Sequence, residues 1–350
     1  MAQPATSASP PGGDRRRLAD APSDDGAAPR AAPPEDAPAG DAPSWDVLAG
    51  AALRQLGGLA TAPLRVPLVA GQRLAGPWRA DLRRSVRRSL GVPGEPPPRP
   101  ARPGTAFLPP GGVARRVHGD LPSMVVGGLA ALLLQTLHPL AMAGVADHST
   151  YREDAIGRLR RTASFVGATT FGTVDEAEEA IERVREVHRR IHGRAPDGRR
   201  YSANDPELLT WVHVAEVHSF LAAARRYGPA HLDAADCDRY FAETAVVARS
   251  LGARWVPESA DEVDAYFHRV RPELYAGHQA MEARDFLLRG VARRPNDRAV
   301  YACIVAAALA VLPRWARAEL RIPAPPLVDE VLVTPVARTV LGALRWTIKP

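Results

Sequence analysis

The first feature of this sequence that could carry chemistry is a histidine within an apolar helical stripe. Between Val174 and His192, apolar residues recur at intervals of four and three, as on one face of a helix. The stripe consists of Ala177, Ile181, Val184, His188 and Ile191. An imidazole on a buried face needs a hydrogen-bond partner or a metal. His188 is therefore a candidate metal ligand, and a core histidine bonded to a carbonyl oxygen is the structural alternative.

A second histidine stands close to the first. His192 follows His188 by four residues, at the edge of the stripe, and Gly193 is expected to stop the helix there. Two histidines at this spacing can bind one metal ion from a single helix face. His192 is therefore the alternative metal ligand.

A group of polar side chains on the preceding predicted helix could bind an anion. Arg158, Arg161 and Thr162 are spaced so that they share one helix face. An arginine on an apolar face is costly unless it meets an anion, such as a carboxylate of a bound cofactor. A cluster of surface arginines, to which Arg160 belongs, is the alternative interpretation.

Three further polar residues stand among apolar neighbours. Proline imposes an extended conformation on the residue before it, so His138, which precedes Pro139, is expected at a helix end or turn. His213 and Glu216 lie one turn apart on a later predicted helix. They could position a ligand, or they could satisfy each other's hydrogen bonds, which is the usual arrangement of buried polar groups.

Composition argues against several classes of function. The formal net charge is +6, but Lys349 is the sole lysine, and no nucleic-acid-binding motif accompanies the arginines. No nucleic-acid partner is expected. The two cysteines, Cys237 and Cys303, lie far apart, which disfavours a disulfide framework and a cysteine zinc site. The sequence has no dinucleotide-binding glycine motif, no phosphate-binding loop, no nucleophile elbow and no H-E-x-x-H motif.

The hydrophobic pattern predicts an all-α protein with one multi-helix globular domain. Residues 1–45 are rich in Ala, Pro, Asp and Gly and are expected to be a disordered extension. Residues 46–114 form a mixed, proline-rich region, with a short arginine-rich helix at about 78–90 that packs on the domain or lies on an anionic membrane surface. The catalytic domain is expected over 115–295, with 296–350 as a helical extension that packs on it.

Local signals predict where the main helices begin and end. Asp120 can cap an apolar helix over 124–134, and a second apolar helix covers 299–312. Both are short for membrane spans and fit buried helices better. Thr173 and Glu176 have the form of a capping box. Asp205 and Pro206 begin a helix that should end before Gly228.

Taken in order, these residues resemble a known family, the MpaB-type oxygenases, which are related to latex-clearing rubber oxygenases and to a fungal membrane-bound oxygenase that cleaves terpenoid side chains. The resemblance covers roughly residues 115–295. Its motifs here are His138–Val145, Asp147–Ser149, Tyr151–Arg152, Arg158–Thr162, Phe171–Gly172, Val187–Gly193, Pro196–Gly198, Tyr201, Asn204–Leu209, Trp211–His213 and Ser219. The ordered series is more specific than any single motif.

The resemblance implies a helical, globin-reminiscent domain that binds haem b, with His188 matching the iron-binding histidine of the family. It implies that Arg158 pairs with a haem propionate, that Arg161 and Thr162 act on dioxygen as catalytic groups, and that His138 and His213 help to bind the cofactor. Rubber oxygenases carry Arg-x-x-Lys-Thr at the haem, and this chain has Arg161 in place of that lysine. The implied substrate is a hydrophobic alkene or isoprenoid.

Two other functions remain open from the sequence. One is a haem-free helical protein that binds a lipid or isoprenoid, and the other is a protein held peripherally at a membrane. Arg15–Arg17 precede no apolar segment, so we expect no cleavable signal peptide and a cytoplasmic location.

Overall fold

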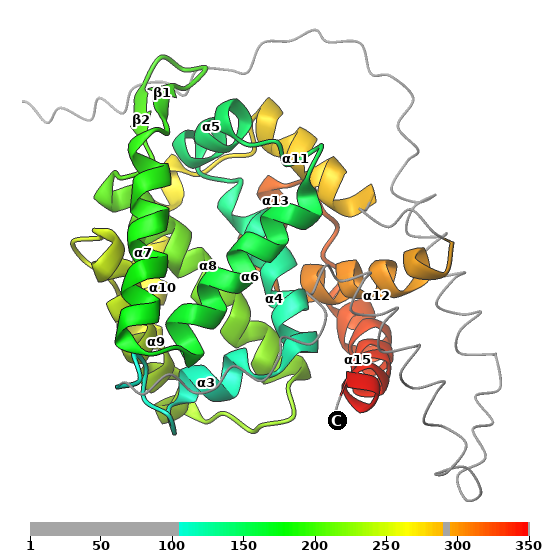
Figure 1. The fold of residues 1–350 in the computed structure, drawn as a ribbon. Helices are drawn as coiled ribbons and strands as arrows, with labels where there is room; N and C mark the ends of the chain where they lie inside the picture. Colours follow the sequence, from blue (N-terminus) through cyan, green and yellow to red (C-terminus); the bar gives the residue numbers. More distant parts are fainter. Residues whose placement is uncertain (1–104, 290–294, 349–350) are drawn as a thin grey trace, which may run out of the picture. The chain divides into compact units, whose positions relative to one another are not determined.

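The structure is a computed structural model that describes residues 105–289 and 295–348. The expected disordered extension over 1–45 and the expected arginine-rich helix at 78–90 lie outside the described residues. The prediction of an all-α fold is confirmed for the described part, which is helical apart from one short hairpin and one isolated bridge (Figure 1).

The described chain contains helices and one short hairpin, in the following order. The first half comprises α3 (Val113–His118), α4 (Leu121–Gln135), α5 (Pro139–His148), α6 (Ala155–Phe171), α7 (Val174–Arg189), β1 (His192–Arg194) and β2 (Arg200–Ser202). The second half comprises α8 (Pro206–Tyr227), α9 (Ala234–Leu251), α10 (Ala260–Val270), the 3-10 turn η1 (Arg271–Glu273), α11 (His278–Arg289), α12 (Pro295–Val311), α13 (Arg314–Glu319), α14 (Pro326–Val328), the π-helical turn η2 (Asp329–Val333) and α15 (Thr334–Ile348).

The centre of the core is the pair α4 and α8. Asp120 caps α4 as expected, because its carboxylate accepts a hydrogen bond from the Ser123 amide at 3.2 Å. Gly127 permits a close approach of the two helices, since a Cβ there would lie 2.9 Å from the Cα of Phe220. The apolar side chains of α4 therefore pack directly on α8, and α12 covers them from the other side.

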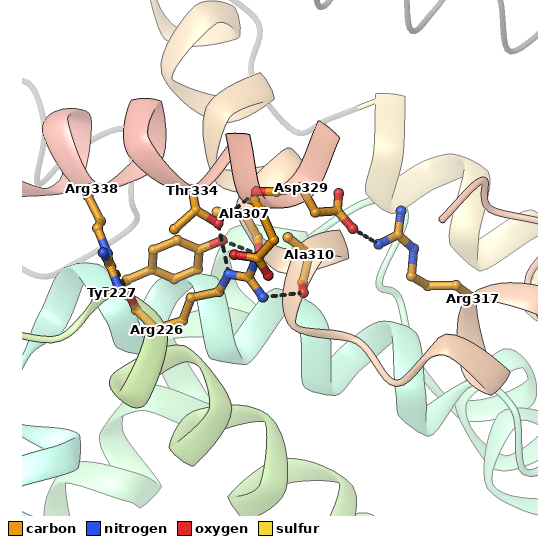
Figure 2. Close-up of polar contacts among 9 residues, drawn as sticks. Arg226, Tyr227, Ala307, Ala310, Arg317, Asp329, Thr334 and Arg338 are labelled. Atoms are coloured by element: carbon orange, nitrogen blue, oxygen red, sulfur yellow. Dashed lines mark hydrogen bonds and ion pairs between the residues drawn. The ribbon is translucent and has the colours of Figure 1, made fainter. Parts of the chain in front are cut away.

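Polar contacts attach the C-terminal helices to α8 (Figure 2). The Arg226 guanidinium donates to Thr334 Oγ1 at 2.9 Å and to the Ala310 carbonyl at 3.2 Å, and it pairs with Glu330. Nearby, Arg317 pairs with Asp329. One side chain of α8 thus contacts α12, η2 and α15 together, which fixes the position of the C-terminal segment.

α6 and α7 form an antiparallel pair that spreads apart from the connection at Gly172 (Figure 1). The predicted capping box is confirmed: Thr173 Oγ1 accepts from the Glu176 amide at 3.3 Å, and the Glu176 carboxylate accepts from the Thr173 amide at 3.1 Å. α6 packs mainly on α7 and α3, and makes little contact with α4 or α8. The two helices therefore form a layer beside the α4–α8 core.

The end of α7 differs from the expectation. The helix stops at Arg189, and His192 and Gly193 belong to β1, which pairs with β2 in an antiparallel hairpin. A Cβ at Gly193 would lie 2.6 Å from the Tyr201 hydroxyl, so the hairpin depends on a residue without a side chain there. The prediction that the helix extends to His192 is wrong: α7 ends three residues earlier, and from His192 onward the chain pairs as a strand.

No single helix among the described residues is long and apolar enough to cross a membrane. α4 and α5 reach the necessary length and composition only together, and they are bent by 105° at their junction. Most of the α4 side chains are buried within the protein.

Candidate functional site

His188 lies in the last turn of α7 and is half-buried. Its Nδ1 atom is buried and has no hydrogen-bond partner. Burial lowers the pKa of the imidazole, so the ring is neutral at physiological pH. A neutral imidazole with a free ring nitrogen can accept a metal ion or a hydrogen bond.

His192 does not share this environment. Its side chain is exposed, and its backbone pairs with Ser202 in the hairpin. A pair of histidines on one helix face therefore does not exist here. Sequence spacing suggested that pair because it assumed three more residues of helix than the chain forms.

Arg158 on α6 and His188 on α7 lie at similar distances along their helices from the α6–α7 connection, although they are 30 positions apart in the sequence. Arg158 precedes the end of α6 by thirteen residues, and His188 follows the start of α7 by fourteen. With a rise of 1.5 Å per residue, both lie about 20 Å from the connection. Arg158 is partly buried, donates to Ser149 Oγ at 2.5 Å, and has its pKa lowered by burial. A cation and a neutral imidazole thus stand at the wide end of the α6–α7 layer.

The other two residues of the predicted face are exposed. Arg161 pairs with Asp154 at 3.3 Å, and both side chains are more than half exposed. The Thr162 side chain is exposed as well. The three residues therefore differ in burial: Arg158 is partly buried, whereas Arg161 and Thr162 are exposed among the described residues.

His138 is confirmed at a helix end, as the residue that precedes α5, with an extended backbone. It is 4% exposed, its Nδ1 atom has no partner, and its ring lies 6.0 Å from that of Trp211. Burial lowers its pKa to about 4. His138 is therefore a second neutral imidazole with a free nitrogen.

His213 and Glu216 do not satisfy each other, contrary to the interpretation that the sequence favoured. His213 Nε2 is buried without a partner, and burial lowers the pKa of this imidazole to about 4. Burial also raises the pKa of the Glu216 carboxyl to about 7. Within the described residues Glu216 makes no hydrogen bond or ion pair, so both polar groups are left available for a ligand or a proton.

Sequence reasoning missed a buried chain of polar groups beside this pair. His118 shares hydrogen bonds with Thr170 Oγ1 at 2.7 Å and with the Tyr240 hydroxyl at 2.9 Å. It links α3, α6 and α9, and its pKa is lowered to about 3, chiefly by burial and also by His213. The one signal in the sequence, a histidine between Val117 and Gly119, is too common to identify it.

The described residues contain no cluster of several metal ligands. No three His, Cys, Asp or Glu side chains converge as a metal site in the part of the chain that the structure describes. His138, His188 and His213 instead each have a lowered pKa and one buried ring nitrogen without a partner. A cofactor that takes one imidazole ligand would be held by such a histidine, and Arg158 would be the cation available to a negatively charged group on it.

Comparison with known proteins identifies the family. Residues 115–346 match the family described as "ER-bound oxygenase mpaB/B'/Rubber oxygenase, catalytic domain". Searches of curated proteins and of solved structures gave no match. The match covers more than half of the chain. It includes every helix that contributes to the site, except for the first two residues of α3. The chain therefore belongs to the MpaB/rubber oxygenase family and carries its catalytic domain.

Proposed function

We propose that the protein is a haem b-dependent oxygenase that acts with dioxygen on a hydrophobic alkene or isoprenoid. The observation that carries this proposal is the buried Nδ1 atom of His188, which has no partner in the protein. Leaving a buried nitrogen unpaired costs about 1–3 kcal/mol, a cost that ligand binding would remove. Membership of an oxygenase family supports the same reading.

The residues fit this cofactor in charge and in protonation. Iron is bound by a neutral imidazole, and burial keeps His188 neutral. Arg158 would bind a propionate through its guanidinium, in exchange for its bond to Ser149. When bound, the haem supplies the chemistry that activates dioxygen.

The remaining side chains would control the surroundings of the reaction. His138 and His213 are neutral, so each offers one N–H donor and one acceptor without adding charge to an apolar site. Glu216, with a pKa near 7, can hold or release a proton at neutral pH. Arg161 and Thr162 are exposed in the described structure, and their proposed role on dioxygen requires that the cofactor or substrate cover them.

The test is the absorption spectrum of protein purified from haem-supplemented cells. We expect a Soret band in the wild type and in His192→Ala, and its loss in His188→Ala. Circular dichroism of each variant checks that the helices are intact. A Soret band of full intensity in His188→Ala would refute the ligand, and a colourless, folded wild type would favour the haem-free isoprenoid-binding protein.

The substrate class is tested separately by oxygen uptake. The haem-loaded protein is supplied with an isoprenoid alkene and with its saturated analogue. We expect oxygen uptake with the alkene and none with the saturated analogue, because oxidative cleavage needs the double bond. Equal uptake with both compounds would contradict the proposed substrate class.

A further inference from the structure

A cavity of about 250 Å³ lies between α8, α10 and the junction of α12 and α13. Its lining includes His218, Asp264, Phe267, His268, Arg271 and Trp315. None of the residues that we assign to haem lines it. The cavity is therefore a second place on the protein where a small molecule could bind.

The inner wall of this cavity is aromatic and well packed. Phe267 is 5% exposed and lies edge-on to the ring of His218, with 5.0 Å between ring centroids. The Trp315 ring lies 5.7 Å from Phe267 on the other side. Trp211 packs on Phe267 from within the core, at 6.3 Å. These contacts hold a rigid surface against which a flat apolar ring can pack.

Among the polar side chains that line the cavity, Asp264, His268 and Arg271 are exposed and His218 is half-buried. His218, Asp264, His268 and Arg271 make no hydrogen bond or ion pair with another described residue. The Arg271 guanidinium lies over the Trp315 ring, 5.3 Å from the ring centroid. Four polar groups thus line one cavity, open to solvent, where a ligand could replace water as their hydrogen-bond partner.

The charges of these groups select the type of ligand. Arg271 offers a planar pair of donors that matches a carboxylate. Burial lowers the pKa of His218 to about 4, so its neutral ring has one donor and one acceptor nitrogen. Asp264, which raises the pKa of His218 slightly, can accept a hydrogen bond from a hydroxyl group. A ligand that suits all three groups has an anionic end, a hydroxyl end and a flat body.

We propose that this cavity binds a small aromatic acid that carries a hydroxyl group. The carboxylate would bind Arg271, the hydroxyl would bind His218 and Asp264, and the ring would pack on Phe267 and Trp315. An engineered cavity of about 150 Å³ holds benzene, so a cavity of this size holds roughly ten non-hydrogen atoms. A ligand of that size binds with a Kd on the order of 0.1–1 mM.

The test is ligand-observed saturation-transfer NMR with 4-hydroxybenzoate as the probe. Phenol lacks the carboxylate and benzoate lacks the hydroxyl, so each should bind at least about 5-fold more weakly. Arg271→Leu should weaken binding of 4-hydroxybenzoate about 10-fold or more, the effect of losing one charged hydrogen-bonded contact. Arg269→Leu is the matched control, because Arg269 also lies over aromatic rings, those of Trp255 and Tyr266, but does not line the cavity.

The outcomes are separate from those of the haem proposal, since binding is measured with and without haem and is expected to be equal. Absence of saturable binding up to 10 mM probe, about ten times the weakest expected Kd, would overturn the proposal. Equal binding to wild type and Arg271→Leu, or equal binding of phenol and 4-hydroxybenzoate, would also overturn it. A second variant, Trp315→Leu, keeps the charges and should weaken binding through the lost ring contact.

Discussion

Several buried imidazoles of this protein have lost the proton affinity that they would have in water. Burial lowers the pKa of His118 to about 3 and those of His138, His213 and His218 to about 4. The unfolded chain takes up protons on these groups below pH 6.5, whereas the folded protein takes them up only at lower pH. The free energy of unfolding should therefore fall as the pH falls from about 6.5 towards 4.

This acid sensitivity can be assigned to single residues. In His138→Leu, the unfolded chain no longer takes up a proton at this position. The slope of unfolding free energy against pH between 4.5 and 6 should therefore decrease by up to about 1.4 kcal/mol per pH unit. Urea unfolding at several pH values measures it. His231→Leu, at an exposed histidine, is the control and should leave the slope unchanged. Equal slopes in wild type and His138→Leu would show that His138 titrates normally.

Glu216 should change the unfolding free energy with pH in the opposite direction from the buried histidines. Its pKa is raised to about 7 in the folded protein, above the value of 4.5 for an unperturbed carboxyl. The stability that it contributes is present below pH 4.5 and is lost as the pH rises through 7. Relative to wild type, Glu216→Gln should therefore gain stability between pH 5 and 7, by up to about 1.4 kcal/mol per pH unit.

The control for this prediction lies on the same helix. Glu207 is exposed in the first turn of α8, and Glu207→Gln should show no such pH-dependent gain. Infrared spectroscopy gives a second readout: a protonated carboxyl band present at pH 6 should disappear by pH 9 and be absent from Glu216→Gln. If the band persists in Glu216→Gln, another group carries that proton.

At the scale of elements, α4 and α8 approach each other closely in the core. A Cβ at Gly127 would lie 2.9 Å from both the Cα of Phe220 and the carbonyl oxygen of Ser219. These are backbone atoms, which cannot move without shifting the helix. Gly127→Ala should therefore destabilise the protein by about 1–3 kcal/mol in thermal or urea unfolding.

The next residue provides a matched comparison. A Cβ at Gly128 meets only Phe220 Cε1 at 3.8 Å, an ordinary contact. Gly128→Ala should stabilise the protein by roughly 0.5–1 kcal/mol, because alanine favours the helix. Similar effects of the two substitutions would indicate that α4 and α8 are further apart than described.

At the scale of the whole described molecule, one ion pair connects helices near the beginning and the end of the described residues. Arg345 on α15 donates to both carboxylate oxygens of Asp120, at 2.6 and 2.7 Å, and Asp120 also caps α4. The side chains are 17% and 9% exposed. The guanidinium also donates to the Tyr227 carbonyl, so α4, α8 and α15 meet at this pair.

Removing the arginine should be costly because it leaves a buried carboxylate without its partner. Arg345→Met is expected to destabilise the protein by about 3–5 kcal/mol in urea unfolding at pH 7. The difference should shrink as the pH falls through the lowered pKa of Asp120, because the protonated carboxyl no longer needs a cation. Arg338→Met is the control: Arg338 is exposed on the same helix and donates only to the Arg226 carbonyl. Equal losses in the two variants would contradict the special role of Arg345.

The sequence by itself determined most of the helices, because helices follow from local signals, whereas His188 as the iron ligand stays a prediction. Apolar periodicity, the cap at Asp120, the capping box at Thr173 and the proline after His138 act within a few residues, and the structure confirms each of them. The ordered series of motifs likewise identified the family before any contact was known.

Tertiary structure alone decided which of these side chains are buried, paired or free. The end of α7 at Arg189 depends on the hairpin, in which Tyr201 pairs with Gly193. The hydrogen bonds of His118 to Thr170 and Tyr240 likewise join residues that are 70 positions apart. Burial and the absence of a partner, which leave His188 and His213 neutral with a free nitrogen, are properties of the surrounding helices. Such properties arise from contacts between distant segments, and the spacing of residues along one helix carries no information about them.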